Sequence, residues 1–264
     1  MIVEKMLKLG FTEEQINTIL TNYAILRLRK SNVSKLVGEM LDFFKNYGYS
    51  DEDIVKMSKL HPQIYGYSAT NISQKILFLE NLGYAKVEII KMTKSCPQIF
   101  SLSTENIINK LEVMKGLGYK ISNLLNMISR FPQILTLSNE YIVNKFNDLI
   151  GLGYTNKEVI KITIKLPQIW SLTMENITTK KEFYDSIGIS SFILVKANLL
   201  MQSVELSYAR YMFYMSIGKT IDSNNYMDIF CGQKRFETLY GKTNKDLIEL
   251  YPYDKEEILK RIKK

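Results

Sequence analysis

The tripeptide Pro-Gln-Ile occurs four times in this chain of 264 residues and uses four of its five prolines. These are Pro62, Pro97, Pro132 and Pro167, each 35 residues after the one before (97 − 62 for the first pair). A Gly-Tyr pair keeps the same interval at Gly48, Gly83, Gly118 and Gly153, and Gly188 continues it, followed by Ile. Self-similarity at such a period is typical of a solenoid of small helical units that cannot bury their apolar faces alone.

The stretch from Gly83 to Gly118 shows what one unit contains. A first helix follows Gly83, and it must end near Cys96 because Pro97 disfavours the helical conformation in the residue before it. The segment "PQIFSL" predicts a short 3₁₀ connector with its Ile in the core. Ser103 is then the expected N-cap of a second helix that closes at Gly118. The equivalent caps are Ser68, Ser138 and Thr173. The connector glutamines are expected to bond backbone groups or the neighbouring unit, with contact to a ligand as the alternative: Gln63, Gln98, Gln133 and Gln168.

These patterns predict an all-α fold, a curved helical-repeat solenoid with two helices and a short 3₁₀ turn per unit. We expect an atypical N-terminal capping repeat over residues 1–47, regular repeats over 48–218 and a C-terminal helical cap over 219–264. Both ends are irregular, as solenoid ends usually are. Ala24 takes the proline position of the first unit.

The C-terminal part departs from the regular spacing. Gly218 follows Gly188 by only 30 residues (218 − 188), which places the five missing residues in the connector if Ser203 is the cap. From Lys219 the pattern is expected to dissolve into a Tyr-rich segment, followed by a terminal helix capped by Asp254.

Composition excludes several classes of protein. The net charge of +8 comes from 35 basic and 27 acidic residues spread along the chain, so any basic surface must be created by folding. No apolar run reaches the roughly 18 residues of a membrane helix. The single histidine, His61, stands in an apolar slot, and the two cysteines are too few for a zinc site. "GKT" at 241–243 lacks the earlier glycine of a phosphate-binding loop. We expect no enzymatic activity, no cofactor and no metal.

The unit resembles the repeats of the mitochondrial transcription termination factor (mTERF) family. The resemblance rests on the mid-unit Pro-Gln-Ile and on Leu-Gly-Tyr at 82–84, 117–119 and 152–154, and it extends over about residues 9–218. It implies a curved α-helical solenoid whose basic concave face binds nucleic acid, in proteins of organelle transcription, ribosome assembly and RNA processing. This chain departs from the organelle members because its start shows no transit peptide. The expected location is therefore cytoplasmic, with a trimmed organelle protein as the alternative.

Two repeated positions carry positive charge. Eight residues before each boundary glycine stand Lys75, Lys110, Lys145, Lys180 and Arg210, and one helical turn earlier stand Asn71, Asn106, Tyr141 and Asn176. Cations beside amide and phenol groups suit contacts to phosphate and sugar, so these nine residues are the predicted nucleic-acid site. A second row lies on the first helices: Lys56, Lys91, Lys161 and Lys196, with Asn126 in the gap, accompanied by Lys59, Lys94, Arg130 and Lys165. We favour the row on the second helices as the concave one, because it includes Arg210.

The sequence therefore predicts a monomeric, non-enzymatic protein that binds nucleic acid, with duplex DNA favoured, and that acts in transcription regulation or termination. RNA, including ribosomal RNA, is the alternative ligand on the same surface. The alternative of another class is a scaffold for protein partners, for which the C-terminal segment is the candidate surface. A further alternative is that the repeated lysines bind no ligand. Their aliphatic stems would then cover the edge of the core while the ammonium groups remain in solvent.

Overall fold

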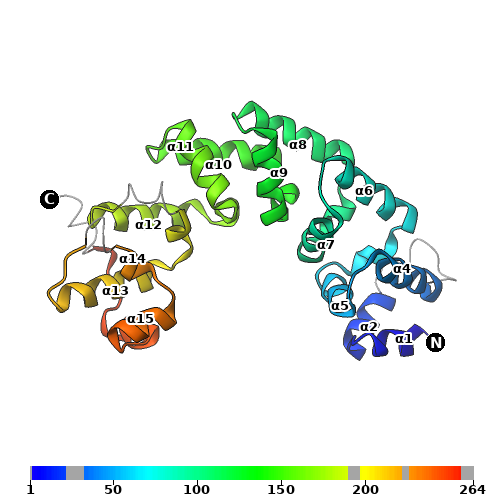
Figure 1. Cartoon of the computed structure of the whole chain (residues 1–264), viewed down its shortest axis with the longest axis horizontal. Coiled ribbons are helices and arrows are strands. Elements are labelled where there is room, and N and C mark those ends of the chain that lie inside the picture. The colour runs from blue at the N-terminus through cyan, green and yellow to red at the C-terminus, as the bar shows by residue number, and fades with distance from the viewer. Residues whose placement is uncertain (1, 22–32, 190–196, 222–225, 257–264) are drawn as a thin grey trace. The chain divides into compact units, whose positions relative to one another are not determined.

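The computed structural model describes residues 2–21, 33–189, 197–221 and 226–256, and these form two compact units, Met1–Ile142 and Val143–Lys264. Every regular element in these ranges is an α-helix or a 3₁₀ helix (Figure 1), so the all-α prediction is confirmed. Within the same ranges, no helix has the length and apolarity to cross a lipid bilayer.

In the part of the first unit that the structure describes, α-helices precede the first connector, and helix pairs joined by 3₁₀ turns follow. Its elements are α1 (Ile2–Lys8), α2 (Glu13–Leu20), α4 (Val33–Tyr47), α5 (Asp51–Leu60), η1 (Pro62–Gly66), α6 (Ala69–Asn81), α7 (Lys86–Ser95), η2 (Pro97–Ser101), α8 (Thr104–Gly116), α9 (Ile121–Arg130) and η3 (Pro132–Thr136). The division between the units falls within α10 (Asn139–Gly151). The helices before the connectors (α5, α7, α9, α11) are called first helices below, and those after them second helices.

The second unit continues the alternation. Its elements after α10 are α11 (Asn156–Lys165), η4 (Pro167–Ser171), α12 (Met174–Ser186), η6 (Ala197–Met201), α13 (Val204–Ser216), α14 (Met227–Phe230), α15 (Gln233–Tyr240) and α16 (Asn244–Leu250). Ala24, in the proline position of the first repeat, lies outside the described residues, so its prediction stays open.

The connectors form as the proline pattern predicts. Residues before proline avoid the helical region, and Cys96, for example, has φ −143° and ψ 71° and ends α7. The 3₁₀ turn that follows directs the connector isoleucines Ile64, Ile99, Ile134 and Ile169 into the core, where each is 0% exposed. The next position is also buried, with Tyr65 and Trp170 fully covered, so Trp170 is a packing residue and not a platform for bases.

The boundary glycines end the second helices because only glycine adopts their backbone conformation easily. Gly83 has φ +101°, in the region that side chains disfavour. Its amide donates to the Glu80 carbonyl at 2.9 Å, and the Tyr84 amide donates to the Leu79 carbonyl at 3.2 Å. This pair of bonds is the Schellman arrangement, which satisfies carbonyls at the helix end.

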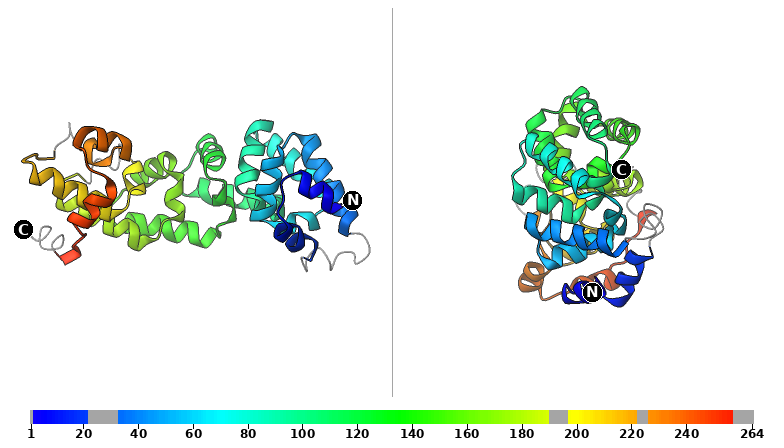
Figure 2. Two further views of the ribbon diagram at one scale, coloured as in Figure 1. Left: turned by 90° about the horizontal axis from the view of Figure 1, so that it is seen from below. Right: turned by 90° about the vertical axis from the view of Figure 1, so that its right-hand side faces the viewer.

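Consecutive repeats of the first unit are held together through their first helices. Helix α7 packs against α5 on one side and α9 on the other (Figures 1 and 2). The boundary tyrosines contribute polar bonds between repeats: the Tyr84 hydroxyl donates to the Leu125 carbonyl at 3.0 Å, and the Tyr49 and Thr93 hydroxyls lie 2.6 Å apart. The Gln133 amide donates to the Ser95 carbonyl at 3.3 Å, which confirms for this glutamine that it bonds the neighbouring repeat.

Two expectations about the C-terminal part are wrong. The connector after Gly188 is present as η6, with Leu199 and Leu200 buried at 1% and 2% exposure. The core needs two apolar residues at each connector, so the five missing residues fall before Ala197. The stretch 190–196 there, which includes Lys196, lies outside the described residues.

The pattern also continues after Lys219. Gly241 has φ +64° and ends α15, and Thr243 caps α16 by accepting from the Asp246 amide, as Ser50 caps α5. Tyr251 then has φ −128° and ψ 74° and precedes Pro252, so the fifth proline occupies the same place as the other four. The Asp254 side chain accepts from the Glu256 amide at 2.9 Å, as expected of a cap, while the rest of that predicted helix lies outside the described residues.

Candidate nucleic-acid interface

The five cations predicted to bind phosphate are buried. Their exposed fractions are 6% for Lys75, 5% for Lys110, 2% for Lys145, 3% for Lys180 and 1% for Arg210. The charges of Lys110, Lys145, Lys180 and Arg210 are engaged in hydrogen bonds within the protein, and Lys75 lines a pocket, so the row does not form an exposed basic face. The expectation that this row lines an exposed basic surface is therefore wrong, while its contact with nucleic acid stays a prediction.

Most of these cations bond the connector of the following repeat. The Lys110 ammonium donates to the Leu137 carbonyl and to Asn139 Oδ1, the Lys145 ammonium to the Leu172 carbonyl, and the Lys180 ammonium to the Leu200 carbonyl at 2.5 Å. Carbonyls at the end of a 3₁₀ turn have no partner in the turn itself. The positive charge at this position satisfies them, and it links each second helix to the next repeat.

Arg210 repeats this arrangement with the forked geometry of a guanidinium. Its Nη1 donates to the carbonyls of Ile229 at 2.8 Å and Cys231 at 2.5 Å, and its Nη2 donates to Asn244 Oδ1 at 2.7 Å. The guanidinium also stacks 4.3 Å from the ring centroid of Phe236. Arg210 thus attaches α13 to α14, α15 and α16, which explains why the cation persists after the five-residue deletion.

Burial also changes the acid–base behaviour of the row. Loss of hydration disfavours the charged amine, so burial lowers the pKa of Lys75, Lys110 and Lys180, and lowers the pKa of Lys145 to about 8. Lys75 is the exception in its contacts: it has no hydrogen bond to a carbonyl in the described part of the chain and lies 5.8 Å from the ring centroid of Phe78.

The polar residues one turn earlier are exposed, but their backbone has a structural task. Asn71, Asn106, Tyr141 and Asn176 each donate a backbone amide to the preceding cap, Ser68, Ser103, Ser138 and Thr173 respectively. Their side chains remain candidates for contact with a ligand, which stays a prediction. Of the nine predicted site residues, the structure places Asn71 and Lys75 in one pocket, which is described further below.

The first helices present the exposed positive charge. Lys56 and Lys59 on α5, Lys91 on α7, Arg130 on α9, and Lys161 and Lys165 on α11 are exposed, and Lys94 is half-buried. We call these seven residues the first-helix cations. Since α7 packs between α5 and α9, the first-helix cations of the first unit lie on adjacent helices. The sequence favoured the row on the second helices, but the row on the first helices is the one that is accessible to solvent.

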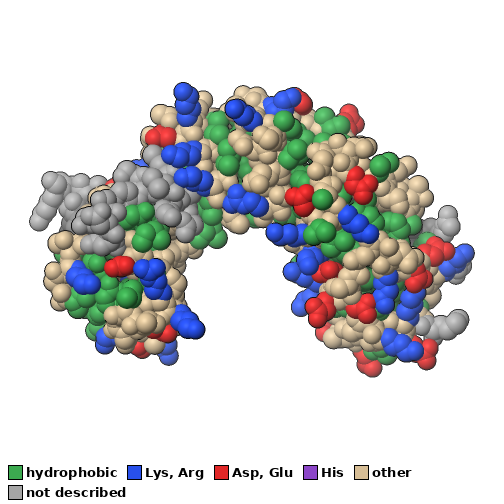
Figure 3. Space-filling model, viewed as in Figure 1, with side chains coloured by type: hydrophobic (Ala, Val, Ile, Leu, Met, Phe, Trp, Pro, Cys, Tyr) green, Lys and Arg blue, Asp and Glu red, His purple; other side chains and the backbone are tan. Residues whose placement is uncertain are grey.

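Acidic residues on these helices are confined to the first turns. Asp51, Glu52 and Asp53 begin α5, while Glu88 and Glu158 lie in the first turns of α7 and α11. The helix dipole stabilises acidic residues in the first turn and basic residues later in the helix, so part of this pattern is structural. Figure 3 accordingly shows blue and red side chains interspersed over α5 and α7. The Lys94 ammonium lies 2.9 Å from an Asp53 carboxylate oxygen, an ion pair between neighbouring repeats that fixes Lys94.

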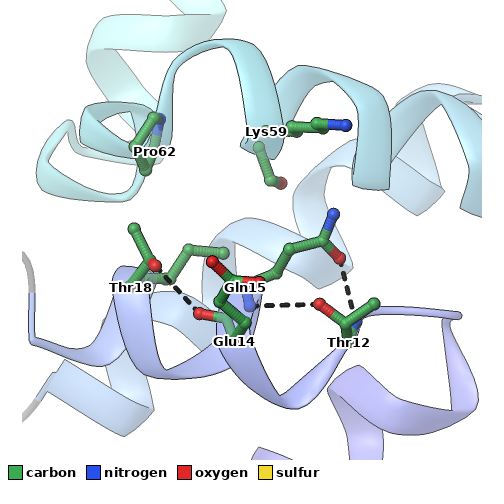
Figure 4. A pocket seen from close by; sticks show the side chains of 8 residues that line it. Thr12, Glu14, Gln15, Thr18, Lys59 and Pro62 are labelled. Carbon is green, nitrogen blue, oxygen red and sulfur yellow. Dashed lines mark hydrogen bonds between the residues drawn. The ribbon is translucent and has the colours of Figure 1, made fainter.

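A small cavity of about 380 Å³ lies at the edge of this surface, between α2 and the α5–η1 segment. Figure 4 shows Lys59 and Pro62 above it and Thr12, Gln15 and Thr18 below. The polar groups below are occupied in their own helix: the Gln15 amide donates to Thr12 Oγ1, the Thr12 amide to Gln15 Oε1, and Thr18 Oγ1 to the Glu14 carbonyl. The cavity therefore adds Lys59 to the basic surface and no separate site.

No described group of residues forms a reactive centre. His61 is half-buried beside the Tyr67 ring, and burial lowers its pKa. Burial raises the pKa of the Cys96 thiol to about 11, which keeps it protonated and unreactive near neutral pH. Among the described residues, no three His, Cys, Asp or Glu side chains are grouped as a metal site would need.

Nothing in the sequence pattern pointed to the hydrogen-bond acceptors of the buried cations. Asn139, which accepts from Lys110, stands at a position occupied by Ala69, Thr104 and Met174 in the other repeats, so no regularity marks it. Three of the first-helix cations, Lys56, Lys91 and Lys161, stand at one repeated position in the sequence, and the segregation of acids to the first turns was the signal that distinguishes these helices.

Comparison with known proteins agrees with the repeat geometry. No curated protein sequence matches the chain. The mTERF family matches residues 68–190, which contain three complete connectors and their flanking helices. Members of this family are in general nucleic-acid-binding proteins with transcription-related roles. Residues 68–190 of this chain thus match the mTERF family, in agreement with the resemblance seen in the repeats.

Proposed function

We propose that this protein is a non-enzymatic nucleic-acid-binding protein and that the first-helix cations make its phosphate contacts. The observation that carries the proposal is the exposure of positive charge on the adjacent first helices α5, α7 and α9, beyond the acidic first turns of α5 and α7. The match of residues 68–190 to the mTERF family supports the ligand class. Regulation or termination of transcription is the process we propose.

The spacing of the cations suits a polyanion. Packed helices lie about 8–10 Å apart, so the neighbouring first helices α5, α7 and α9 offer positive charge at about that interval. A nucleic-acid strand rises about 3.4 Å per nucleotide, so each repeat would meet the backbone about every third phosphate. Contacts of this kind position a nucleic acid without reading its sequence. We favour duplex DNA as the ligand, and RNA is the outcome that the experiment below separates from it.

The test measures binding of labelled duplex DNA, single-stranded DNA and RNA over a range of salt concentrations. The variant replaces four first-helix cations by Gln: Lys56→Gln, Lys59→Gln, Lys91→Gln and Lys161→Gln. The matched control removes the same charge elsewhere, at four exposed lysines outside the first helices: Lys8→Gln, Lys115→Gln, Lys234→Gln and Lys242→Gln.

If all four first-helix cations contact phosphate, the log–log salt slope on duplex DNA falls by about 3 to 4 in the variant and changes much less in the control. The preferred ligand of the unmodified protein identifies DNA or RNA. Equal slopes in the two variants would show that the first helices are not the interface. Absence of salt-dependent binding to any of the three ligands would refute the function itself and direct attention to protein partners.

A further inference from the structure

We infer that the pocket between α6 and the start of α8 is a binding site for a single phosphate group, held by Lys75 and the N-terminus of α8. The pocket has a volume of about 430 Å³ and is lined by Tyr67, Asn71, Gln74 and Lys75 from one repeat and by residues 100–104 from the next. It lies wholly within the first unit. It is separate from the first-helix cations, since it is formed by second helices and a connector.

The first observation is a largely buried cation whose charge contacts the Phe78 ring, with the ammonium 5.8 Å from the ring centroid. Lys75 is only 6% exposed, yet it makes no hydrogen bond or ion pair in the described part of the chain, and it lines the pocket. The Lys75 ammonium itself is not fully enclosed, so it can be reached from the pocket, where an anion would supply the hydrogen bonds that it lacks. Its three lysine counterparts Lys110, Lys145 and Lys180 all donate to the carbonyls of the next connector.

The second observation is the helix that starts at the opposite wall. Helix α8 has 13 residues, and its cap Ser103 accepts from the Asn106 amide. The amides of Thr104 and Glu105, one and two residues after the cap, have no intrahelical acceptor because they belong to the first turn. Free amides and the positive end of the helix dipole favour an anion, and a tetrahedral phosphate accepts from several donors at once.

A comparison with the next repeat explains why this pocket differs. Where Lys110 finds the Oδ1 acceptor of Asn139, the corresponding residue beside Lys75 is Thr104, whose hydroxyl can donate to a phosphate. The Asn71 and Gln74 amide groups, on the α6 wall, add further donors. One negatively charged side chain, which would repel phosphate, is close in sequence. Glu105 lies in the first turn of α8, but it is exposed and is not among the residues that line the pocket.

The phosphate could come from a nucleic-acid backbone or from a free phosphate ester, and the chemistry of recognition is shared. If the phosphate belongs to a nucleic acid, the role of the site rests on the proposed function. Binding of a single phosphate group does not depend on that function, so the experiment measures it separately.

The experiment titrates the full chain with inorganic phosphate at constant ionic strength and follows backbone amide NMR signals, with chloride as the reference anion. We expect saturable shifts of the Thr104 and Glu105 amides with phosphate. Lys75→Gln should weaken phosphate binding about tenfold or more, because a charge-assisted hydrogen bond is lost. Glu105→Gln should strengthen it by about two- to fivefold, because a like charge near the helix N-terminus is removed.

Lys110→Gln is the matched control, because this lysine occupies the same repeat position but is already bonded to Leu137 and Asn139. It should leave the phosphate response unchanged and lower the melting temperature, whereas Lys75→Gln should leave the melting temperature without phosphate nearly unchanged. Equal phosphate binding by the unmodified protein and Lys75→Gln overturns the inference. A fall in melting temperature equal to that of Lys110→Gln does so too, since Lys75 would then be a link between repeats.

A second titration of the same proteins with a short oligonucleotide and with a nucleoside monophosphate separates the two sources. Shifts of Thr104 and Glu105 with the oligonucleotide at lower concentration support a backbone contact, and shifts with the monophosphate alone support a free ester. If the first-helix variant loses nucleic-acid binding while these amides still respond to phosphate, both proposals stand. If nucleic acid does not bind at all, the phosphate response is judged by itself.

Discussion

The Lys110 ammonium donates a hydrogen bond to the Leu137 carbonyl, 27 residues further along the chain and in the connector of the next repeat. The side chain belongs to α8 and the acceptor to the end of η3, so one charged group joins two repeats that local helix formation would leave independent. Solenoids gain stability from such contacts between neighbours as well as from each repeat. The same relationship at Lys145, Lys180 and Arg210 makes the row a property of the fold.

Replacing Lys110 by Met is expected to lower the free energy of unfolding by about 1–3 kcal/mol, because it leaves the Leu137 carbonyl without its partner. Met has similar length and no charge, so the loss reports the bond and not a cavity. Urea unfolding followed by circular dichroism measures it. The control is Lys115→Met, since Lys115 is exposed and pairs with Glu112 three residues earlier on the same helix. A stable Lys110→Met protein that no longer binds nucleic acid would restore the row as the binding site.

Arg210→Lys is expected to loosen the C-terminal helices although it keeps the charge. Lysine has no fork to reach the Ile229 carbonyl and Asn244 Oδ1 together, and it loses the planar stacking on Phe236. We expect a loss of about 1–2 kcal/mol in the opening free energy of α15 and α16. Hydrogen exchange of the backbone amides measures this locally. Unchanged exchange in α15 and α16 would mean that apolar packing alone holds them.

The helices, connectors and caps of this fold were predictable because each is decided locally. Proline fixes where a first helix ends, a hydroxyl three residues before a helical amide fixes where a second helix begins, and glycine fixes where it closes. The direction of the Lys110 side chain is not local, since it depends on the Leu137 carbonyl of another repeat. A lysine at the edge of an apolar stripe is compatible with either a solvated or a buried ammonium, so the pattern alone favoured the wrong row.

The C-terminal repeat shows a different limit. Pro252 follows Gly241 by 11 residues (252 − 241), whereas Pro62 follows Gly48 by 14 (62 − 48), because α16 is shorter than α5. A fixed period conceals this relationship, while the capping box of Thr243 and Asp246 would have indicated a helix start. The interval between the boundary glycine and the proline can vary, because the feature that recurs is the backbone geometry of the residue before proline and not the length of the helix.

Unfolding stability is expected to rise with pH from about 8 to about 9.5. Burial lowers the pKa of Lys145 to about 8 in the folded protein, whereas an unfolded lysine keeps a pKa near 10.4. Between these values the unfolded state binds more protons, so stability increases with pH, by at most about 2 kcal/mol at pH 9.5. Lys145→Met should lack most of this rise when urea unfolding is measured at several pH values.

The rise should end near pH 10, and the tyrosines supply the reason. Burial raises the pKa of Tyr49, Tyr65 and Tyr84 above the ordinary value of 10, so the unfolded state loses these protons first and stability falls at higher pH. A flat profile between pH 8 and 9.5 in the unmodified protein would mean that the bond to the Leu172 carbonyl offsets the loss of hydration at Lys145.

Two glycines at the end of α10 give a matched pair of substitutions with opposite expected signs. A Cβ atom added at Gly151 or at Gly153 would meet no atom within 4 Å, so neither change creates a clash. Gly151 is the last residue of α10, and Ala there should stabilise the protein by about 0.4–1 kcal/mol through reduced freedom of the unfolded chain. Gly153 has φ +96°, which side chains rarely adopt, so Ala there should destabilise by about 1–3 kcal/mol. Thermal unfolding of the two variants measures both effects. Equal changes would show that the boundary position does not need glycine, and the 35-residue period of Gly-Tyr would then require an explanation other than backbone conformation.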